Sequence, residues 1–161
     1  MADAPGLHVP VAGVAVTSGE QVLSAVGLGS CVAVMVHDPV RRVAGMAHVL
    51  LPDTALTRDT SRPGKCANTA VPHLVEQMQA AGAGVGLVAR IAGGAAMFAA
   101  LAPSGVNMGE RNAEAVRAAL ATAGIPVVGE DVGGEHGRSV YFHAPSGRVD
   151  VVSLRLGRRV L

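Results

Sequence analysis

Two valine-rich apolar runs on either side of a turn signal constrain the fold of this chain more than any other feature. The runs cover residues 31–37 and 42–51, and Asp38-Pro39 lies between them. Aspartate favours the first position of a β-turn, and proline fixes φ at the second position. The pattern therefore predicts an antiparallel β-hairpin.

The predicted hairpin brings a thiol and an imidazole together. If the turn runs from Asp38 to Arg41, Cys31 lies directly opposite His48 on one face, with the two Cβ atoms about 4.5–5.5 Å apart. A neighbouring imidazolium stabilises the thiolate, which is the reactive form of cysteine. We therefore expect Cys31 to be a nucleophile and His48 its base, provided that the pairing does not slip by one residue.

The same residues also have simpler interpretations. Free cysteine is among the most buried residue types, so Cys31 fits a core position, and His48 fits a hydrogen-bonded core histidine. Gly27 and Gly29 permit close backbone approach before the cysteine. They either aim the amides of Ser30 and Cys31 at a developing oxyanion or form only a tight entry to the strand.

The rest of the chain alternates between short apolar strands and two amphipathic helices. The helices are expected over residues 69–81 and 110–123, where apolar residues recur at helical spacing. The polar segment 53–65 is expected to be an exposed loop over a site. Further strands are expected over residues 11–16, 21–26, 85–92, 127–130, 139–143 and 148–156.

These elements indicate a single α/β (α+β) domain over residues 1–161, with packed mixed β-sheets flanked by helices. The first ten residues are expected to be loosely ordered. Phe98 is expected to be buried rather than to anchor a partner.

Composition excludes several functional classes. A net charge of +1 provides no basic surface for nucleic acid. The longest uncharged apolar stretch, residues 91–102, is well short of the roughly 20 residues that span a bilayer. The N-terminus lacks the basic region of a signal peptide, so we expect a soluble cytoplasmic protein without membrane insertion.

Cysteine and histidine usage argues against a disulfide framework or a metal site. The two cysteines, Cys31 and Cys66, are expected to be free thiols in a reducing compartment. The six histidines show no paired-ligand spacing, and no cofactor is expected. Cys66 is a weaker candidate nucleophile, which His73 could approach.

Several separate segments resemble the chemoreceptor glutamine deamidases, the CheD family. They follow one another in the family's order from about residue 11 to residue 152. The segments are Gly27-Leu-Gly-Ser-Cys31, Asp38-Pro39, Met46-Ala-His48-Val-Leu-Leu-Pro52, Pro63-Gly-Lys65, Ile91-Ala-Gly-Gly-Ala-Ala-Met-Phe98, Asn107-Met-Gly-Glu-Arg-Asn112, Asp131-Val-Gly-Gly134 and Arg138-Ser139.

The resemblance implies a protein-glutamine amidohydrolase of chemotaxis signal transduction. Such enzymes convert glutamine side chains of methyl-accepting chemotaxis receptors to glutamates, and they also bind CheC-type phosphatases. The family's cysteine nucleophile and histidine base match Cys31 and His48. Its fold is similar to that of toxin-type cysteine deamidases, with mixed sheets packed together and helices outside.

One position departs from the family pattern. The family commonly has a threonine, its third catalytic residue, where this chain has Ala25, and neighbouring Ser24 should face the opposite side of the strand. Cys66 also stands where relatives have an aromatic residue. Two alternatives therefore stay open: a non-catalytic adaptor that binds receptor or phosphatase, and a thiol hydrolase of small amides.

Overall fold

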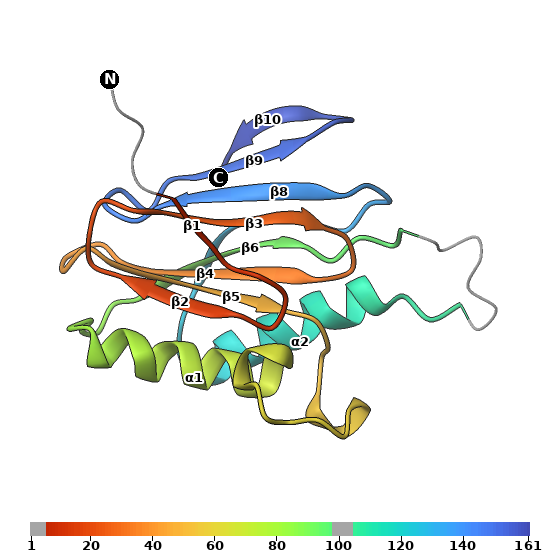
Figure 1. The fold of residues 1–161 in the computed structure, drawn as a ribbon, viewed down its shortest axis with the longest axis horizontal. Helices are drawn as coiled ribbons and strands as arrows, with labels where there is room; N and C mark the ends of the chain where they lie inside the picture. Colours follow the sequence, from red (N-terminus) through yellow and green to blue (C-terminus); the bar gives the residue numbers. More distant parts are fainter. Residues whose placement is uncertain (1–5, 98–104) are drawn as a thin grey trace.

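The structure is a computed structural model that describes residues 6–97 and 105–161 (Figure 1). Two five-stranded sheets pack face to face, and two helices lie against the second sheet on its far side, so the molecule has three layers. This arrangement confirms the expected α+β domain of packed mixed sheets. Phe98 lies outside the described residues.

The first sheet has the strand order β1-β3-β8-β9-β10. It is mixed, because β1 runs parallel to β3 while the other neighbours are antiparallel. Its inner face contributes Leu23 and Phe142, both fully buried, to the core between the sheets. The strands are β1 (Gly6–His8), β3 (Val22–Leu28), β8 (Arg138–His143), β9 (Val149–Ser153) and β10 (Gly157–Val160).

The second sheet has the strand order β2-β5-β4-β6-β7, and only its β6–β7 pair is parallel. Every residue of β4 and β5 is buried, because the first sheet covers one face and the helices cover the other. Burial on both faces explains why these strands read as continuous apolar runs. The strands are β2 (Val14–Thr17), β5 (Val43–Val49), β4 (Val32–Asp38), β6 (Val88–Gly93) and β7 (Val127–Val132).

The helices are α1 (Ala67–Ala80) and α2 (Met108–Thr122). Each presents an apolar stripe to the second sheet, as the helical spacing predicts; Leu74 and Met78 lie on the α1 stripe. The carboxamide oxygen of Asn107 caps α2 by accepting from the Glu110 amide at 3.0 Å. Within the described residues, no helix has the length and apolar character to cross a bilayer.

Three expectations need correction. Residues 6–8 form strand β1 and Val9 is 1% exposed, so the loose order expected for the first ten residues does not hold for residues 6–9. The strand expected over residues 148–156 ends at Ser153, where a turn leads into β10. Segment 53–65 contains two short 3-10 turns, η1 (Thr54–Leu56) and η2 (Pro63–Lys65), and lines a different pocket from the one at Cys31.

Candidate active site

The β4–β5 hairpin has a different register from the expected one. Ala33, not Cys31, pairs with His48, and the loop joining the strands has four residues between Asp38 and Val43. Cys31 lies one residue before β4 begins. The prediction that Cys31 and His48 are directly opposite is therefore wrong by two residues.

The side chain of Asp38 explains the longer loop. Its carboxylate accepts from the amides of Val40 at 3.0 Å, Arg41 at 2.9 Å and Gly84 at 2.8 Å. These bonds turn the chain inside the loop and displace the predicted two-residue turn. Arg42 completes the loop in the left-handed region, at φ 57°.

A displacement of two residues leaves the faces unchanged, because side chains alternate with a period of two. Ala33 and His48 face each other, and Cys31 packs against the same core cluster as Ala33. Cys31 and His48 thus lie diagonally on the face toward the first sheet, an arrangement with a typical separation of about 7–8 Å. Among the described residues, no hydrogen bond joins their side chains.

Three hydrogen bonds connect His48 to the segment that follows β1. Its ring Nδ1 lies 3.0 Å from the carbonyl oxygen of Val9. Its backbone bonds to the Ala12 amide at 2.8 Å and to the Gly13 carbonyl at 3.0 Å. Because a carbonyl only accepts, Nδ1 carries the proton and Nε2 keeps the lone pair that a base requires.

Cys31 lines a pocket of about 450 Å³. The elements that line it meet at the right-hand end of the ribbon in Figure 1. The turn between β3 and β4, the end of β6 and the start of α2 meet there. Gly29 and Ser30 line the pocket with Cys31, whereas His48, only 3% exposed, does not. The other lining residues are Ala95, Ala96, Met97, Val106, Asn107, Met108 and Gly109.

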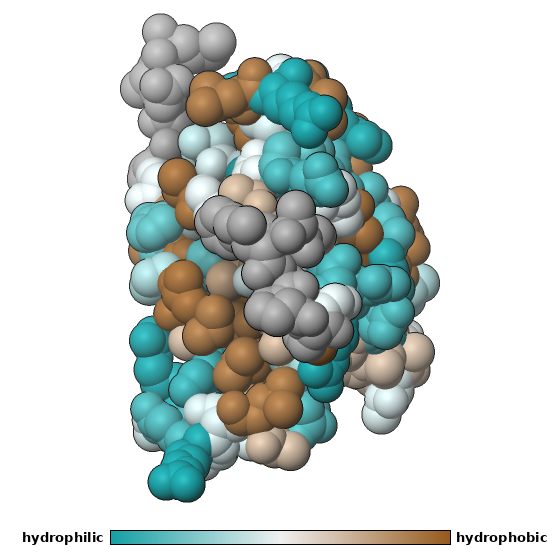
Figure 2. Space-filling model, turned by 90° about the vertical axis from the view of Figure 1, so that its right-hand side faces the viewer, coloured by the Kyte–Doolittle hydropathy of each residue, from teal (hydrophilic) through white to brown (hydrophobic). Residues whose placement is uncertain are grey.

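The pocket has exposed apolar side chains in its lining. Figure 2 shows the same end of the molecule, where brown apolar surface lies among teal polar surface. Met97 and Val106, which line the pocket, are 41% and 47% exposed. The pocket can therefore receive a side chain from a partner with apolar surface around it.

Burial sets the charge state of the pair. It raises the pKa of the Cys31 thiol, an effect that the residue's own backbone amide partly offsets. Burial also lowers the pKa of His48, against the opposing effect of the Val9 carbonyl. Both shifts favour the uncharged forms, a neutral thiol and a neutral imidazole, near neutral pH.

Two glycines of β6 and its following turn fix the backbone of Cys31. Gly94 donates to the Cys31 carbonyl at 2.9 Å, and Ala95 donates to the Gly29 carbonyl at 2.8 Å. Gly93 has a φ of 111°, and a Cβ placed there would lie 2.2 Å from the Cys31 carbonyl oxygen. The close approach that holds Cys31 thus requires glycine at position 93.

The amides of Ser30 and Cys31 have no hydrogen-bond acceptor in another residue, among the residues that the structure describes. Both residues line the pocket, so two backbone donors of this kind belong to the segment that carries the sulfur of Cys31. Such a pair is chemically suited to stabilise a negatively charged oxygen.

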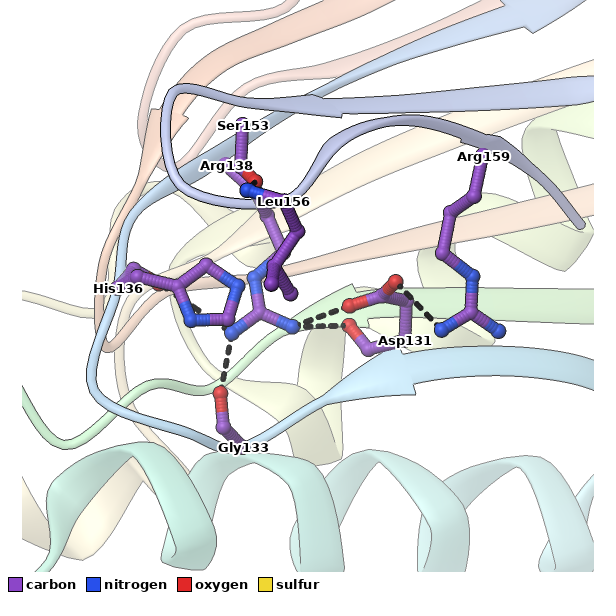
Figure 3. Close-up of polar contacts among 7 residues, drawn as sticks. All are labelled: Asp131, Gly133, His136, Arg138, Ser153, Leu156 and Arg159. Atoms are coloured by element: carbon purple, nitrogen blue, oxygen red, sulfur yellow. Dashed lines mark hydrogen bonds and ion pairs between the residues drawn. The ribbon is translucent and has the colours of Figure 1, made fainter.

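A buried ion pair holds the loop that bonds to the pocket residue Ala96, and Figure 3 shows this ion pair. The guanidinium of Arg138 contacts the Asp131 carboxylate and also donates to the carbonyl of Gly133. The loop ordered in this way continues to Gly134, whose carbonyl accepts from the pocket residue Ala96 at 2.8 Å. Asp131 also pairs with Arg159 of β10 at 3.2 Å, as the dashed line in Figure 3 marks.

The remaining candidates lie away from the pocket. Ala25 is fully buried in the core between the sheets, while Ser24 is half-buried, consistent with the opposite side of β3. Cys66 is a buried free thiol at the start of α1, and His73 lines a different pocket. Across the described residues, no group of three histidine, cysteine or acidic side chains is placed to hold a metal ion.

Two contributors to the site were not predicted from the sequence. One is the main-chain carbonyl of Val9, which no sequence signal reveals because every residue has a carbonyl. The other is Asn112, fully buried on α2, which donates to the carbonyls of Ser30 and Leu50. Asn112 lies one turn before Val116 and Leu120 on the apolar stripe of α2. A polar residue on a stripe that faces the core needs buried hydrogen-bond partners, and this signal could have identified Asn112 from the sequence.

Comparison with known proteins identifies similarity along nearly the whole chain. The family described as "CheD chemotactic sensory transduction" matches residues 50–153. A "Probable chemoreceptor glutamine deamidase CheD" of Caldanaerobacter subterraneus is 39% identical over 153 residues, covering 94% of each chain.

Two further relatives agree with this match. The "Chemoreceptor glutamine deamidase CheD" of Thermotoga maritima is 47% identical over 136 residues, covering 84% of this chain and 83% of the relative. A "Probable chemoreceptor glutamine deamidase CheD" of Archaeoglobus fulgidus is 42% identical over 137 residues, covering 84% of this chain and 86% of the relative.

Proposed function

Because this chain belongs to the CheD family, we propose that it hydrolyses glutamine side-chain amides of methyl-accepting chemotaxis receptors, leaving glutamate and releasing ammonia. The observation that carries the proposal is the position of Cys31. Cys31 lines a pocket in a segment with two amides that have no acceptor in another described residue, and a buried histidine lies on the same face of the hairpin. This arrangement suits attack by sulfur on an amide carbon.

In the proposed mechanism, Nε2 of His48 takes the proton from the Cys31 thiol as the sulfur attacks the glutamine amide carbon. The carbonyl oxygen becomes an oxyanion, which the amides of Ser30 and Cys31 stabilise. The C–N bond then breaks, and the imidazolium gives its proton to the departing nitrogen, which leaves as ammonia.

The second half of the reaction removes the thioester. Neutral His48 takes a proton from water, whose oxygen attacks the thioester carbon. The C–S bond breaks, the sulfur regains the proton, and glutamate is released. The thiol and imidazole must approach each other in the substrate complex, since catalytic hydrogen bonds are often long before substrate binds and shorten in the complex.

We also propose that the Val9 carbonyl performs the orienting role that the family's threonine would perform at position 25. It fixes His48 with Nδ1 protonated, which leaves Nε2 for the cysteine. A carbonyl oxygen can also accept a bond from the imidazolium that forms during the reaction.

The direct test is ammonia release from a receptor cytoplasmic fragment. Cys31→Ala is expected to abolish release, whereas the matched variant Cys66→Ala, which removes a buried thiol outside the pocket, should retain it. Unimpaired release by Cys31→Ala would refute the assignment. Free glutamine serves as a second substrate, and faster release from it than from receptor would favour a hydrolase of small amides.

Ala25 motivates a second candidate function, a non-catalytic adaptor. An adaptor would bind receptor without converting glutamine, and its binding would survive Cys31→Ala. Slow alkylation of Cys31 at neutral pH does not distinguish an adaptor from an enzyme, because burial raises the pKa of this thiol in either case. Turnover decides between them.

We further propose that the chain acts in the cytoplasm and binds a CheC-type phosphatase, as the family resemblance implies. Co-purification of the two proteins, followed by calorimetry, measures this interaction. Binding that persists in Cys31→Ala and absence of binding to an unrelated phosphatase are the expected results. No binding of the CheC-type protein by the wild type would contradict the proposal.

A further inference from the structure

The side chain of Asn112 occupies an unusual place beside the proposed nucleophile. The β4–β5 ladder ends at the pair Val32–Val49, and beyond it the two strands separate. Asn112 fills this end of the hairpin from α2. Its Nδ2 donates to the carbonyl of Ser30 at 2.9 Å and to the carbonyl of Leu50 at 3.0 Å, one from each side of the hairpin.

Both bonds are donated by the N–H groups of the Asn112 carboxamide, and neither involves its oxygen. Asn112 is fully buried, and its Oδ1 has no hydrogen-bond partner among the described residues. A buried acceptor without a partner is unfavourable, and apolar side chains on the same stripe, such as Val116, avoid it. The position therefore uses the amide group for its two N–H donors.

The bond to Ser30 determines where the next amide points. The Ser30–Cys31 peptide is trans, so its C=O and N–H point in opposite directions from one rigid plane. By holding the Ser30 carbonyl on the side of α2, Asn112 directs the Cys31 N–H away from α2. The Cys31 amide faces the sulfur of its own residue, where it favours the thiolate.

The bond to Leu50 acts on the other strand. Leu50 follows His48 by two residues, at the point where β5 has ended. One side chain thus connects the backbone before Cys31 with the backbone after His48. It sets the spacing of the two strands at the end of the hairpin where both candidate residues lie.

We infer that Asn112 is a positioning residue for the reaction of Cys31: its two N–H groups orient the Ser30–Cys31 peptide and fix the spacing of the strands that carry Cys31 and His48. This inference rests on the proposed role of Cys31. It assigns Asn112 no contact with the substrate.

The test compares two Asn112 variants with a neighbour on the same helix. Asn112→Ala removes the carboxamide, and Asn112→Leu removes both donors but keeps the number and branching of the side-chain heavy atoms. Val116→Ala is the matched control, because Val116 is fully buried one turn later and lies in the core between α2 and the second sheet. The readouts are kcat and KM on a receptor fragment, and the pH dependence of Cys31 alkylation followed by mass spectrometry of its peptide.

Both Asn112 variants are expected to lower kcat about tenfold or more with KM within about twofold of wild type. Their alkylation profiles should shift to higher pH, since the thiolate loses a directed N–H donor. Val116→Ala should lose stability but keep the wild-type profile. A wild-type profile in both Asn112 variants, or an equal loss of kcat in Val116→Ala, would overturn the inference.

Failure of the proposed function gives a different result. If Cys31→Ala retains deamidation, Cys31 is not the nucleophile, whatever Asn112 does. If Cys31→Ala is inactive and both Asn112 variants match wild type in kcat and alkylation, only the role of Asn112 is wrong.

Discussion

Two buried histidines of one hairpin differ in what their ring nitrogens are free to do. His37 has its Nε2 2.9 Å from the Ala144 carbonyl, whereas His48 has its Nδ1 3.0 Å from the Val9 carbonyl. Each carbonyl fixes a proton on the nitrogen that it contacts. Nε2 is therefore the available base in His48 but not in His37, although burial lowers the pKa of both.

This contrast provides a matched pair of variants. His48→Gln is expected to lower kcat by a factor on the order of 10² to 10⁴, the usual contribution of a general base. His37→Gln disturbs a similar buried histidine at the far end of the hairpin and should keep kcat near wild type. Ammonia release at saturating receptor fragment measures both. Equal losses in the two variants would assign His48 a structural role only.

At the scale of elements, the site depends on close contact between the end of β6 and the turn before β4. Gly93 and Gly86 both have positive φ, at 111° and 79°. A Cβ at Gly86 would meet nothing within 4 Å, whereas one at Gly93 would meet the backbone of Cys31. The two positions therefore share backbone strain but differ in their contact with the nucleophile.

Gly93→Ala and Gly86→Ala should separate the effect of backbone strain from the effect of displacing Cys31. Gly86→Ala is expected to lose about 1–2 kcal/mol of stability from the left-handed backbone. Gly93→Ala should lose more, because its Cβ would also clash with the Cys31 carbonyl. Gly93→Ala should also lower kcat, because displacing a reacting group by about 1 Å can reduce a rate on the order of 100-fold. Urea unfolding and ammonia release measure the two effects. Wild-type kcat in folded Gly93→Ala would contradict this account of the contact.

The β4–β5 loop should make stability depend on pH. Hydrogen bonds from the backbone amides of Arg41, Gly84 and Val40 lower the pKa of the Asp38 carboxyl. A lowered folded-state pKa contributes stability above the unfolded value of about 3.9, and this contribution is lost as pH falls through the folded-state pKa.

Asp38→Asn should therefore be less stable than wild type at neutral pH and lose less stability on acidification from about pH 5 to about pH 2. The measurement is urea unfolding across this range. If the free energy of unfolding changed with pH equally in the two proteins, Asp38 would not be the source of the pH dependence.

At the scale of the whole molecule, one ion-pair network connects the two sheets. Asp131 lies on β7 of the second sheet, while Arg138 and Arg159 lie on β8 and β10 of the first (Figure 3). The side chain of Arg138 is 2% exposed, and that of Arg159 is 60% exposed. Loss of the inner arginine would leave the buried Asp131 carboxylate with only the exposed Arg159 as its ion-pair partner.

Arg138→Ala is expected to lower the free energy of unfolding by about 3–5 kcal/mol. Arg159→Ala should lower it by less than about 1 kcal/mol, because exposed ion pairs contribute little. Urea denaturation of both variants checks the difference. Similar losses would mean that burial does not decide the contribution of this network.

The hydrophobic pattern was sufficient to predict the layered fold, because both cores use residues at regular spacing. It predicted both helices and most strands. It did not predict β1, whose three residues pair with β3, or β10, which pairs with β9; these two strands form the edges of the first sheet. It also predicted that Cys31 and His48 share a face of the hairpin. This result survives the register error, because a shift of two residues returns each side chain to the same face. The exact register depends on the hydrogen bonds that the Asp38 carboxylate accepts inside the loop. The sequence pattern predicted a turn with two central residues and did not include these bonds.

Other features of the site depend on tertiary contacts between distant segments. The Val9 carbonyl reaches His48 only through the pairing of β1 with β3 and the turn after it. The charge states of the pair follow from burial between the sheets, not from residue type. Asn112 could have been noticed as a polar residue on an apolar stripe, but its contacts with both ends of the hairpin required the fold.

The central claim is that the Cys31 thiol converts receptor glutamines to glutamates. Mass spectrometry of a receptor cytoplasmic fragment, incubated with wild-type protein, Cys31→Ala or Cys66→Ala, counts these conversions at each glutamine. We predict conversion at defined positions by wild type and Cys66→Ala, and none by Cys31→Ala. The same conversions in the presence of Cys31→Ala would contradict the claim.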